Sequence, residues 1–474
     1  MDTPRPDADR RPSLWRNQAF LFLWGGQSVS VLGSTVSGII IPLYAVLALH
    51  VSTFEMGLLA AAGSTPYMLV GLIAGSVVDR YPRRLLMFWC DLGRALALAS
   101  IPLTMLLSGT PTVGQLLVVA LVVGLMTVFF DVAYGSYLPT LVENEQLIDG
   151  NGKLSTTESV AESVGPGLAG ILITVLGRAG AILFDVATYV LSCLSLALIK
   201  TPDEVIEKRA VPRPRQIARE VAEGASYVAR NPILRRLAQF AVTANLFCAA
   251  YGSLEIIFLN RDLHAQAWMI GAAAAIGSTG GVLGGLAAAP LGRRIGTARA
   301  VWLPLFAVGW LVLLIPLAQP GWGFLLVGLG TGGNTASIVM YGAGGASYRQ
   351  ANCPPNLLSR VTSSQRWLAW CSMPAGALLG GVLGSVAGLR AGISIAVAGC
   401  FLAGLWIFFS PLRGLRDLPP APSSSKSAGE TVEEVSELTL AVPVQGNTDH
   451  PDDPSDTFSN EIFVASGSGH EFSG

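Results

Sequence analysis

The chain has 474 residues, of which 51% are hydrophobic and 13% charged, and its formal net charge is −1. Soluble domains contain about 25% charged residues, so this composition excludes an ordinary globular protein of two or three domains. Residues from 412 onward hold eleven Asp and Glu against three Lys and Arg, which leaves 20 acids and 27 bases in the rest. These bases are not interleaved with aromatic residues, so they predict membrane loops and no nucleic-acid surface.

Uncharged apolar runs divide the chain into segments that are long enough to cross a bilayer, which takes about 20 residues. Glycine, proline and charged residues separate these runs. Twelve transmembrane helices are predicted, near residues 20–48, 55–78, 85–107, 113–138, 156–176, 179–200, 233–260, 267–291, 299–317, 321–347, 362–388 and 390–411. The predicted fold class is therefore an all-α polytopic membrane protein with two six-helix bundles.

The basic residues predict which side of the membrane each loop faces. Alternate loops carry nearly all of them, and such loops normally face the cytoplasm, so both termini are predicted to be cytoplasmic. An amphipathic portion around Ile217 to Val228 lies in the connector between the bundles. Five regions are predicted: a cytoplasmic N-terminal segment (1–19), an N-terminal six-helix bundle (20–200), a cytoplasmic connector (201–232), a C-terminal six-helix bundle (233–411) and a disordered acidic tail (412–474).

The two predicted bundles share an internal repeat. Arg83-Arg84 after span two recurs 210 residues later after span eight, and Ser136-Tyr137 in span four recurs 211 residues later in span ten. Two halves of the same orientation are one repeat plan of secondary transporters, in which the substrate site lies between the halves near the midplane. The alternative is a duplicated membrane protein that does not transport.

The predicted loop after span two reads Gly75-Ser-Val-Val-Asp79-Arg80-Tyr-Pro-Arg83-Arg84. It resembles the signature G-x-x-x-D-[RK]-x-G-[RK]-[RK] of the major facilitator superfamily, although Pro82 stands where the family has glycine. Gly75 is expected to let a neighbouring helix approach closely. Asp79 is expected to pair with Arg83 or to accept hydrogen bonds from the N-terminus of span eleven. The loop is a predicted gate; the alternative is that its bases only fix the topology.

Further motifs are similar to the branch of that family with macrolide-efflux and enterobactin-exporter proteins. They are Asp91-Leu-Gly-Arg94, the stretch from Phe129 to Pro139, and Gly165-Pro166-Gly-Leu-Ala-Gly170. The resemblance implies a monomeric drug:proton antiporter of a bacterial cytoplasmic membrane. Its partners would be protons and a small apolar or amphiphilic compound such as a drug, a macrolide or a siderophore-like metabolite. The alternatives are an importer of similar fold and a transport-dead sensor or scaffold.

Ionisable residues inside a span are costly, so they are functional candidates. Asp91, Arg94 and Asp131 reach comparable depth and are predicted to form a buried ion-pair cluster, with either a structural or a proton-relay role. Glu255 has apolar neighbours and no cation in its own helix. The hypothesis is that Glu255 or Asp131 exchanges protons and attracts a cationic substrate. Two further candidates are Glu162, one turn after Glu158, and Asp185, for which a structural role is the alternative.

Glycine and proline mark two predicted helix-packing sites. Gly165, Pro166 and Gly170 in span five resemble the antiporter motif of the family, and Pro374 and Gly376 lie at a similar depth in span eleven. Proline kinks a helix, and glycines permit tight contact between helices. Polar and aromatic side chains predicted to line a cavity are Trp24, Gln27, Tyr134, Asn245, Tyr251, Asn334, Trp367 and Trp370.

Signatures of other protein classes are missing from the sequence. A nucleotide-binding motif G-x-x-x-x-G-K-[ST] does not occur, which argues against an ATP-driven pump. The four histidines fall in predicted outer loops or in the tail, and the six cysteines are scattered without metal-ligand spacing. The sequence therefore predicts no enzyme, no metal site and no cofactor.

Overall fold

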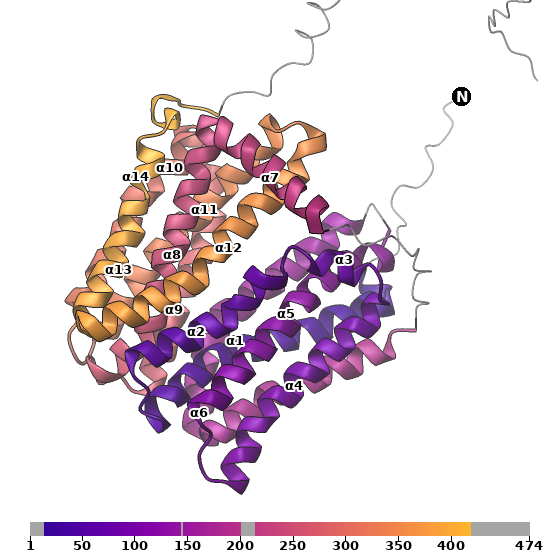
Figure 1. The fold of residues 1–474 in the computed structure, drawn as a ribbon, viewed down its shortest axis with the longest axis vertical. Coiled ribbons are helices and arrows are strands. Elements are labelled where there is room, and N and C mark those ends of the chain that lie inside the picture. Colours follow the sequence, from indigo (N-terminus) through magenta and orange to yellow (C-terminus); the bar gives the residue numbers. More distant parts are fainter. Residues whose placement is uncertain (1–13, 144–145, 201–213, 419–474) are drawn as a thin grey trace, which may run out of the picture. The chain divides into compact units, whose positions relative to one another are not determined.

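The computed structural model describes residues 14–143, 146–200 and 214–418, and every regular element in these ranges is helical. We call α1–α6 the N-half and α8–α14 the C-half; α7 lies between them in the sequence (Figure 1). The elements are η1 (Leu14–Arg16), α1 (Gln18–Ala48), α2 (Thr53–Val70), α3 (Ala74–Val78), α4 (Arg83–Leu107), α5 (Val113–Leu141), α6 (Leu147–Leu198), α7 (Pro214–Arg230), α8 (Pro232–Arg261), α9 (Ala267–Ile295), α10 (Arg299–Ala307), η3 (Gly309–Leu317), α11 (Gly323–Asn352), α12 (Pro355–Val386), α13 (Leu389–Ala403), α14 (Leu405–Phe408) and η4 (Pro411–Gly414). The predicted acidic tail lies outside the described residues from residue 419 onward.

Ten of the described helices are long and apolar enough to cross a membrane. One of them, α6, has 52 residues and is broken at Gly177, whose φ of 69° is the left-handed conformation that favours glycine. At ~1.5 Å per residue an unbroken helix of this length would be far longer than the ~30 Å hydrocarbon core, so α6 supplies two spans. With the shorter α2, helical segments lie in each of the twelve predicted spans. The all-helical polytopic fold is confirmed.

Three predicted spans are interrupted. Span two breaks at residues 71–73, between α2 and α3, and span nine changes from the α-helix α10 to the 3-10 helix η3. Span twelve breaks at Gly404, between α13 and α14.

Polar residues fix the starts of several spans. The Asn17 side chain accepts a hydrogen bond from the Phe20 N–H over 3.1 Å at the start of α1. Ser52 and Glu55 form a reciprocal capping box at the start of α2, and Asn231 caps α8. These caps satisfy N–H groups that the first helical turn leaves free. The apolar helices therefore begin at short polar segments, where the sequence analysis placed the span boundaries.

Within each half, glycines allow helices to pack at backbone distance. A Cβ at Gly280 of α9 would lie 2.1 Å from the Gly332 carbonyl oxygen of α11. A Cβ at Gly376 of α12 would lie 2.1 Å from the Leu246 carbonyl oxygen of α8. In the N-half, α1 packs against α6 through Gly33. Small residues at such crossings are typical of helix packing in membranes.

The amphipathic portion predicted in the connector belongs to α7, which packs on the start of α12. Glu223 of α7 pairs with Arg360 of α12 over 2.7 Å. The Ser364 hydroxyl donates a hydrogen bond to the Val221 carbonyl over 3.1 Å. A Cβ at Gly224 would lie 2.6 Å from the Arg360 carbonyl oxygen, so the two helices are in close contact.

Candidate functional site

The two halves contact each other through α2 with α12 and through α6 with α9 (Figure 1). A Cβ at Gly57 of α2 would lie 2.7 Å from the Ala377 carbonyl oxygen and 2.8 Å from the Gly381 Cα of α12. A Cβ at Gly170 of α6 would lie 2.9 Å from the Ala267 carbonyl oxygen of α9. These contacts lie near the α1–α2 and α8–α9 loops. We call this end of the bundle the distal end. The opposite end, where α7 precedes α8, is called the connector end. The halves are thus in backbone contact toward the distal end.

A cavity of ≈ 770 Å³ lies between the halves and is lined by α1, α6, α8, α9 and α11. We call it the large cavity. Its walls combine small apolar residues with hydroxyl groups such as those of Ser278 and Thr335, and it contains the carboxyl groups of Glu162 and Glu255. Sites for small molecules have volumes of about 300–1,000 Å³ and are mostly apolar with a few polar groups. The large cavity has the size and character to hold a drug-sized compound.

Glu255 faces the large cavity from α8. Its carboxyl group lies beside the hydroxyl groups of Tyr251, one turn earlier, and of Thr331 on α11. These two hydroxyls share a hydrogen bond of 3.0 Å. In the described part of the chain its immediate polar neighbours are therefore hydroxyls. Such a carboxyl group can gain or lose a proton without breaking an ion pair.

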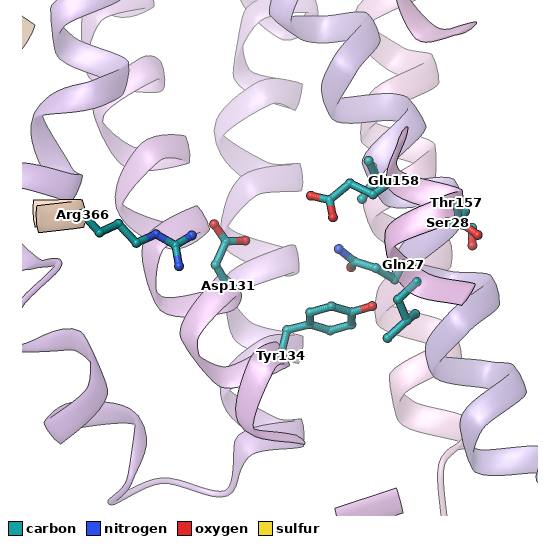
Figure 2. A pocket seen from close by; sticks show the side chains of 9 residues that line it. Gln27, Ser28, Asp131, Tyr134, Thr157, Glu158 and Arg366 are labelled. Carbon is teal, nitrogen blue, oxygen red and sulfur yellow. The ribbon is translucent and has the colours of Figure 1, made fainter. Parts of the chain in front are cut away.

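A second, polar cavity of ≈ 210 Å³ brings opposite charges together, and we call it the small cavity (Figure 2). Asp131 of α5 and Glu158 of α6 enter it from the N-half, and Arg366 of α12 enters it from the C-half. Gln27 and Tyr134 also line it, as the sequence analysis predicted. Figure 2 shows the Arg366 guanidinium directed toward the Asp131 carboxylate. The small cavity is therefore a charged site made by both halves.

A chain of aromatic contacts holds the charges of the small cavity in place. The Tyr67 hydroxyl donates a hydrogen bond to Asp131 Oδ2 over 3.0 Å. The Tyr67 ring meets the Trp370 ring edge to face, with centroids 4.5 Å apart. The Arg366 guanidinium carbon lies 4.6 Å from the centroid of the same Trp370 ring. This arrangement connects α2, α5 and α12 and orients Asp131 and Arg366 toward one space.

Sequence reasoning missed Arg366 and Tyr67. Arg366 lies inside predicted span eleven, where an arginine is costly and is a functional candidate for that reason alone. The neighbouring Trp367 and Trp370 were identified, but the arginine beside them was not. Tyr67 gave no comparable signal, because tyrosine is common in membrane proteins and its bond to Asp131 depends on the packing of α2 against α5.

The predicted cluster of Asp91, Arg94 and Asp131 is divided in the structure. Asp91 and Arg94 form a buried ion pair, with 0% and 4% of each residue exposed. The Arg94 guanidinium carbon also lies 4.3 Å from the ring centroid of Phe130 and 4.6 Å from that of Tyr189. Asp131 instead bonds to Tyr67 and lines the small cavity. Among the described residues, the ion pairs within 4.0 Å thus join Arg94 to Asp91 and not to Asp131, although Asp131 is near enough to interact electrostatically with Arg94.

Asp185 is fully buried where the second part of α6 packs against α1. Its Oδ1 atom accepts a hydrogen bond from the Thr188 hydroxyl over 3.0 Å. A Cβ at Gly33 of α1 would lie 2.4 Å from the same Oδ1 atom, so Asp185 is packed tightly. Asp185 also lines a further cavity of ≈ 470 Å³, so its structural role and its role in proton exchange both stay predictions. Glu162 lines the large cavity.

The contacts expected of Gly75 and Asp79 in the predicted gate are not found among the described residues. Asp79 is exposed at the C-terminus of α3, and the ion pairs among the described residues do not include it. A Cβ at Gly75 would meet no atom within 4 Å, so the close helix approach expected there is absent. The Arg84 guanidinium donates a hydrogen bond to the Ile199 carbonyl oxygen at the end of α6. Roles of Asp79, Arg80 and Arg83 in gating stay a prediction.

The glycine and proline motifs lie at contacts between helices. A Cβ at Gly165 would lie 2.7 Å from the Thr35 side chain of α1. The Pro166 carbonyl oxygen would lie 2.5 Å from a Cβ at Gly271 of α9, next to the contact of Gly170 described above. Pro374 is buried in α12, two residues before Gly376. Both motifs thus hold helices at backbone distance, and the motif in α6 does so between the halves.

Most of the other predicted cavity residues bond to protein groups. The Trp24 Nε1–H donates to the Thr157 hydroxyl over 3.0 Å, and the Trp367 Nε1–H donates to the Met68 carbonyl over 3.2 Å, across the two halves. The Asn245 amide donates to the Ala241 carbonyl in its own helix, and the Asn334 amide donates to Cys248 Sγ over 3.5 Å. These side chains position helices around the cavities.

A polytopic helical bundle whose two halves enclose such cavities has the architecture of a membrane transport protein. The sequence pattern of the Major Facilitator Superfamily matches residues 23–371, and the chain therefore belongs to that family, whose members are transporters and not enzymes.

Individual relatives are distant. The multidrug efflux pump Tap of Mycolicibacterium fortuitum is 26% identical over 383 residues, which cover 78% of this chain and 90% of that protein. Macrolide efflux protein A of Streptococcus pyogenes is 25% identical over 239 residues, which cover 50% of this chain and 57% of that protein. Among solved structures, a bacterial homologue of the iron transporter ferroportin in an inward-facing state is 17% identical, with a TM-score of 0.66 over 84% of this chain and 99% of that chain. This last likeness concerns the fold alone.

Proposed function

We propose that the protein is a proton-coupled secondary exporter of a small apolar or amphiphilic compound, such as a drug, a macrolide or a siderophore-like metabolite. It works by alternating access as a monomer without a cofactor, in the cytoplasmic membrane of a bacterium. The observation that carries this proposal is the large cavity, which both halves line and which contains two carboxyl groups. Distant relatives named as efflux pumps support the outward direction.

The closed distal contacts and the charges at the connector end support a defined orientation. The connector end carries basic residues at helix ends, such as Arg84 at the start of α4 and Arg294 at the end of α9, and an excess of bases normally marks the cytoplasmic side. In this orientation both termini and the connector are cytoplasmic, and the closed distal end faces outward. The proposal includes the two six-helix bundles at residues 20–200 and 233–411 and an acidic tail on the cytoplasmic side. Alternating access would then open the contacts of α2 with α12 and of α6 with α9.

Efflux of fluorescent dyes, macrolides and siderophores from cells that express the protein tests the proposal. Export is expected to stop when a protonophore collapses the proton gradient. Accumulation of a compound inside the cells would instead establish an importer. Membrane-inserted, folded protein that moves no compound in reconstituted vesicles would favour a sensor or scaffold.

The proton-coupling prediction concerns Glu255 and Asp131. Removing the exchangeable proton by Glu255→Gln or Asp131→Asn is expected to lower proton-driven export at least tenfold in one of the two variants and to flatten its pH dependence. The reason is that a carboxamide cannot release a proton, while its size and its hydrogen bonds to Tyr67, Tyr251 or Thr331 are retained. The measurement is the initial export rate between pH 6 and pH 8 in vesicles.

The control variant is Glu143→Gln, because Glu143 is an exposed carboxylate in the loop before α6 and lines neither cavity. It should export at the wild-type rate. Wild-type rates and wild-type pH dependence in both Glu255→Gln and Asp131→Asn would show that neither residue couples protons to transport.

A further inference from the structure

The small cavity places charges of both signs in one space without joining them. Asp131 and Glu158 come from the N-half, and Arg366 comes from the C-half (Figure 2). Ion pairs within 4.0 Å among the described residues do not include any of these three side chains. The Tyr67 hydroxyl and the Trp370 ring orient Asp131 and Arg366, whose side chains point toward each other in Figure 2, with Glu158 beyond Asp131 in this view. Each charge can therefore receive a group from a ligand.

The two sides of the small cavity differ in the groups that they would bind. On the N-half side, the two carboxylates are accompanied by Gln27, whose Oε1 atom is buried and has no hydrogen-bond partner in the described part of the chain. Three acceptors on one side favour a donor with several N–H groups, such as an ammonium. On the C-half side, the Arg366 guanidinium presents a planar set of donors that matches a carboxylate or another oxyanion.

We infer that the small cavity is a head-group subsite for a zwitterionic substrate, whose ammonium group lies against Asp131 and Glu158 and whose anionic group lies against Arg366. This inference rests on the proposed transport function and defines its substrate class. A purely cationic compound is repelled by Arg366, and a purely anionic compound is repelled by the two carboxylates. Specificity by such repulsion supplements the attraction for the correct head group.

The small cavity lies beside the large one. Residues 154–159 of α6 line both cavities: Thr157 and Glu158 line the small cavity, and Thr156 and Ser159 line the large one. The large cavity is therefore on the other side of the same helical turns. The inference concerns the head group alone and assigns no cavity to the apolar body of the substrate.

Four probes with one common naphthyl-alkyl body and different head groups test the inference. The heads are an ammonium, a carboxylate, an amino-carboxylate zwitterion and a hydroxyl, and binding is measured with purified protein in lipid nanodiscs. The zwitterionic probe is expected to bind at least tenfold more tightly than either singly charged probe. Arg366→Gln should abolish this advantage and strengthen binding of the ammonium probe severalfold. Asp131→Asn combined with Glu158→Gln should instead strengthen binding of the carboxylate probe.

Two controls separate head-group recognition from other roles of Arg366. Arg360→Gln changes an arginine of the same helix that pairs with Glu223 outside the small cavity, and it should leave the order of the four probes unchanged. Arg366→Lys keeps the charge and should keep part of the preference for the zwitterion. An equal loss for all four probes in Arg366→Gln would assign Arg366 to holding the halves together and would overturn the inference.

The failure of this inference is distinguishable from failure of the proposed function. Wild-type protein could export dyes but bind the zwitterionic probe no more tightly than the ammonium probe. This result would support the proposed export function and refute the head-group subsite. The opposite outcome would be a protein that shows no proton-driven export but binds the zwitterionic probe preferentially, with a preference that Arg366→Gln removes. This result would support the head-group subsite and refute the proposed export function.

Discussion

Replacing Arg94 by methionine is expected to lower the free energy of unfolding by about 3–5 kcal/mol, the loss that is typical when one partner of a buried ion pair is removed. Asp91 is fully buried, so the variant would leave its carboxylate without the neighbouring guanidinium inside the N-half. The contacts of Arg94 with the rings of Phe130 and Tyr189 would be lost as well. The measurement is the unfolding midpoint of the purified protein in detergent, combined with its elution profile.

A double variant and an exposed pair serve as controls for Arg94. Asp91→Asn combined with Arg94→Met removes both charges and should recover most of the lost stability, because no unpaired buried charge remains. Arg219 pairs with Glu223 on α7, where the two side chains are 81% and 39% exposed. Arg219→Met should therefore change stability by less than about 1 kcal/mol. Equal instability of the single and the double Arg94 variants would show that ring packing, and not charge pairing, is the main contribution of Arg94.

Replacing Gly57 by leucine is expected to reduce transport severely while leaving each half folded. A Cβ at Gly57 would lie 2.7 Å from the Ala377 carbonyl oxygen, so α2 and α12 could not pack at the distal end as they do here. Overpacking of this kind costs about 1–3 kcal/mol, which would lower the population of the closed distal state by roughly 5- to 160-fold. Since alternating access requires this state in each cycle, the export rate should fall by a similar factor.

Gly63 provides the matched control on the same helix. A Cβ there would meet no atom within 4 Å, so Gly63→Leu should leave the closed contact of α2 with α12 in place. Spin labels near the start of α2 and the end of α12 should show a longer distance in Gly57→Leu than in Gly63→Leu. Wild-type export by Gly57→Leu would falsify the proposal that the α2–α12 contact must re-form during transport.

The two carboxyl groups proposed for proton coupling lie in different surroundings. Glu255 lies among hydroxyls in the large cavity, whereas Asp131 faces Arg366 across the small cavity. A proton that binds to Asp131 would weaken the attraction between the two halves at this point, because Arg366 is on the C-half. Substrate head group and proton would then compete for the same carboxylate. This competition is a physical basis for exchanging one for the other across the membrane.

Local features of the sequence were enough to predict the spans, the break in α6 and the ionisable residues that are costly in a bilayer. Hydropathy and loop charge are local properties, so helical segments lie in each of the twelve predicted spans. The α6 break at Gly177 follows from a glycine beside a charged residue between two apolar runs. Asp91 and Arg94 were correctly paired because they lie one helical turn apart.

Contacts between side chains of different helices depend on how the helices pack and could not be predicted from local sequence. Surfaces that face lipid and surfaces that face other helices are both apolar in a membrane protein, so the sequence pattern does not show which face of a helix turns inward. The register of α2 on α12 depends on glycines from both halves, and this register brings Arg366 to Asp131 and Tyr67. For the same reason Asp131 was assigned to the buried ion pair although it lines a cavity. The charged site between the halves is therefore a property of helix packing.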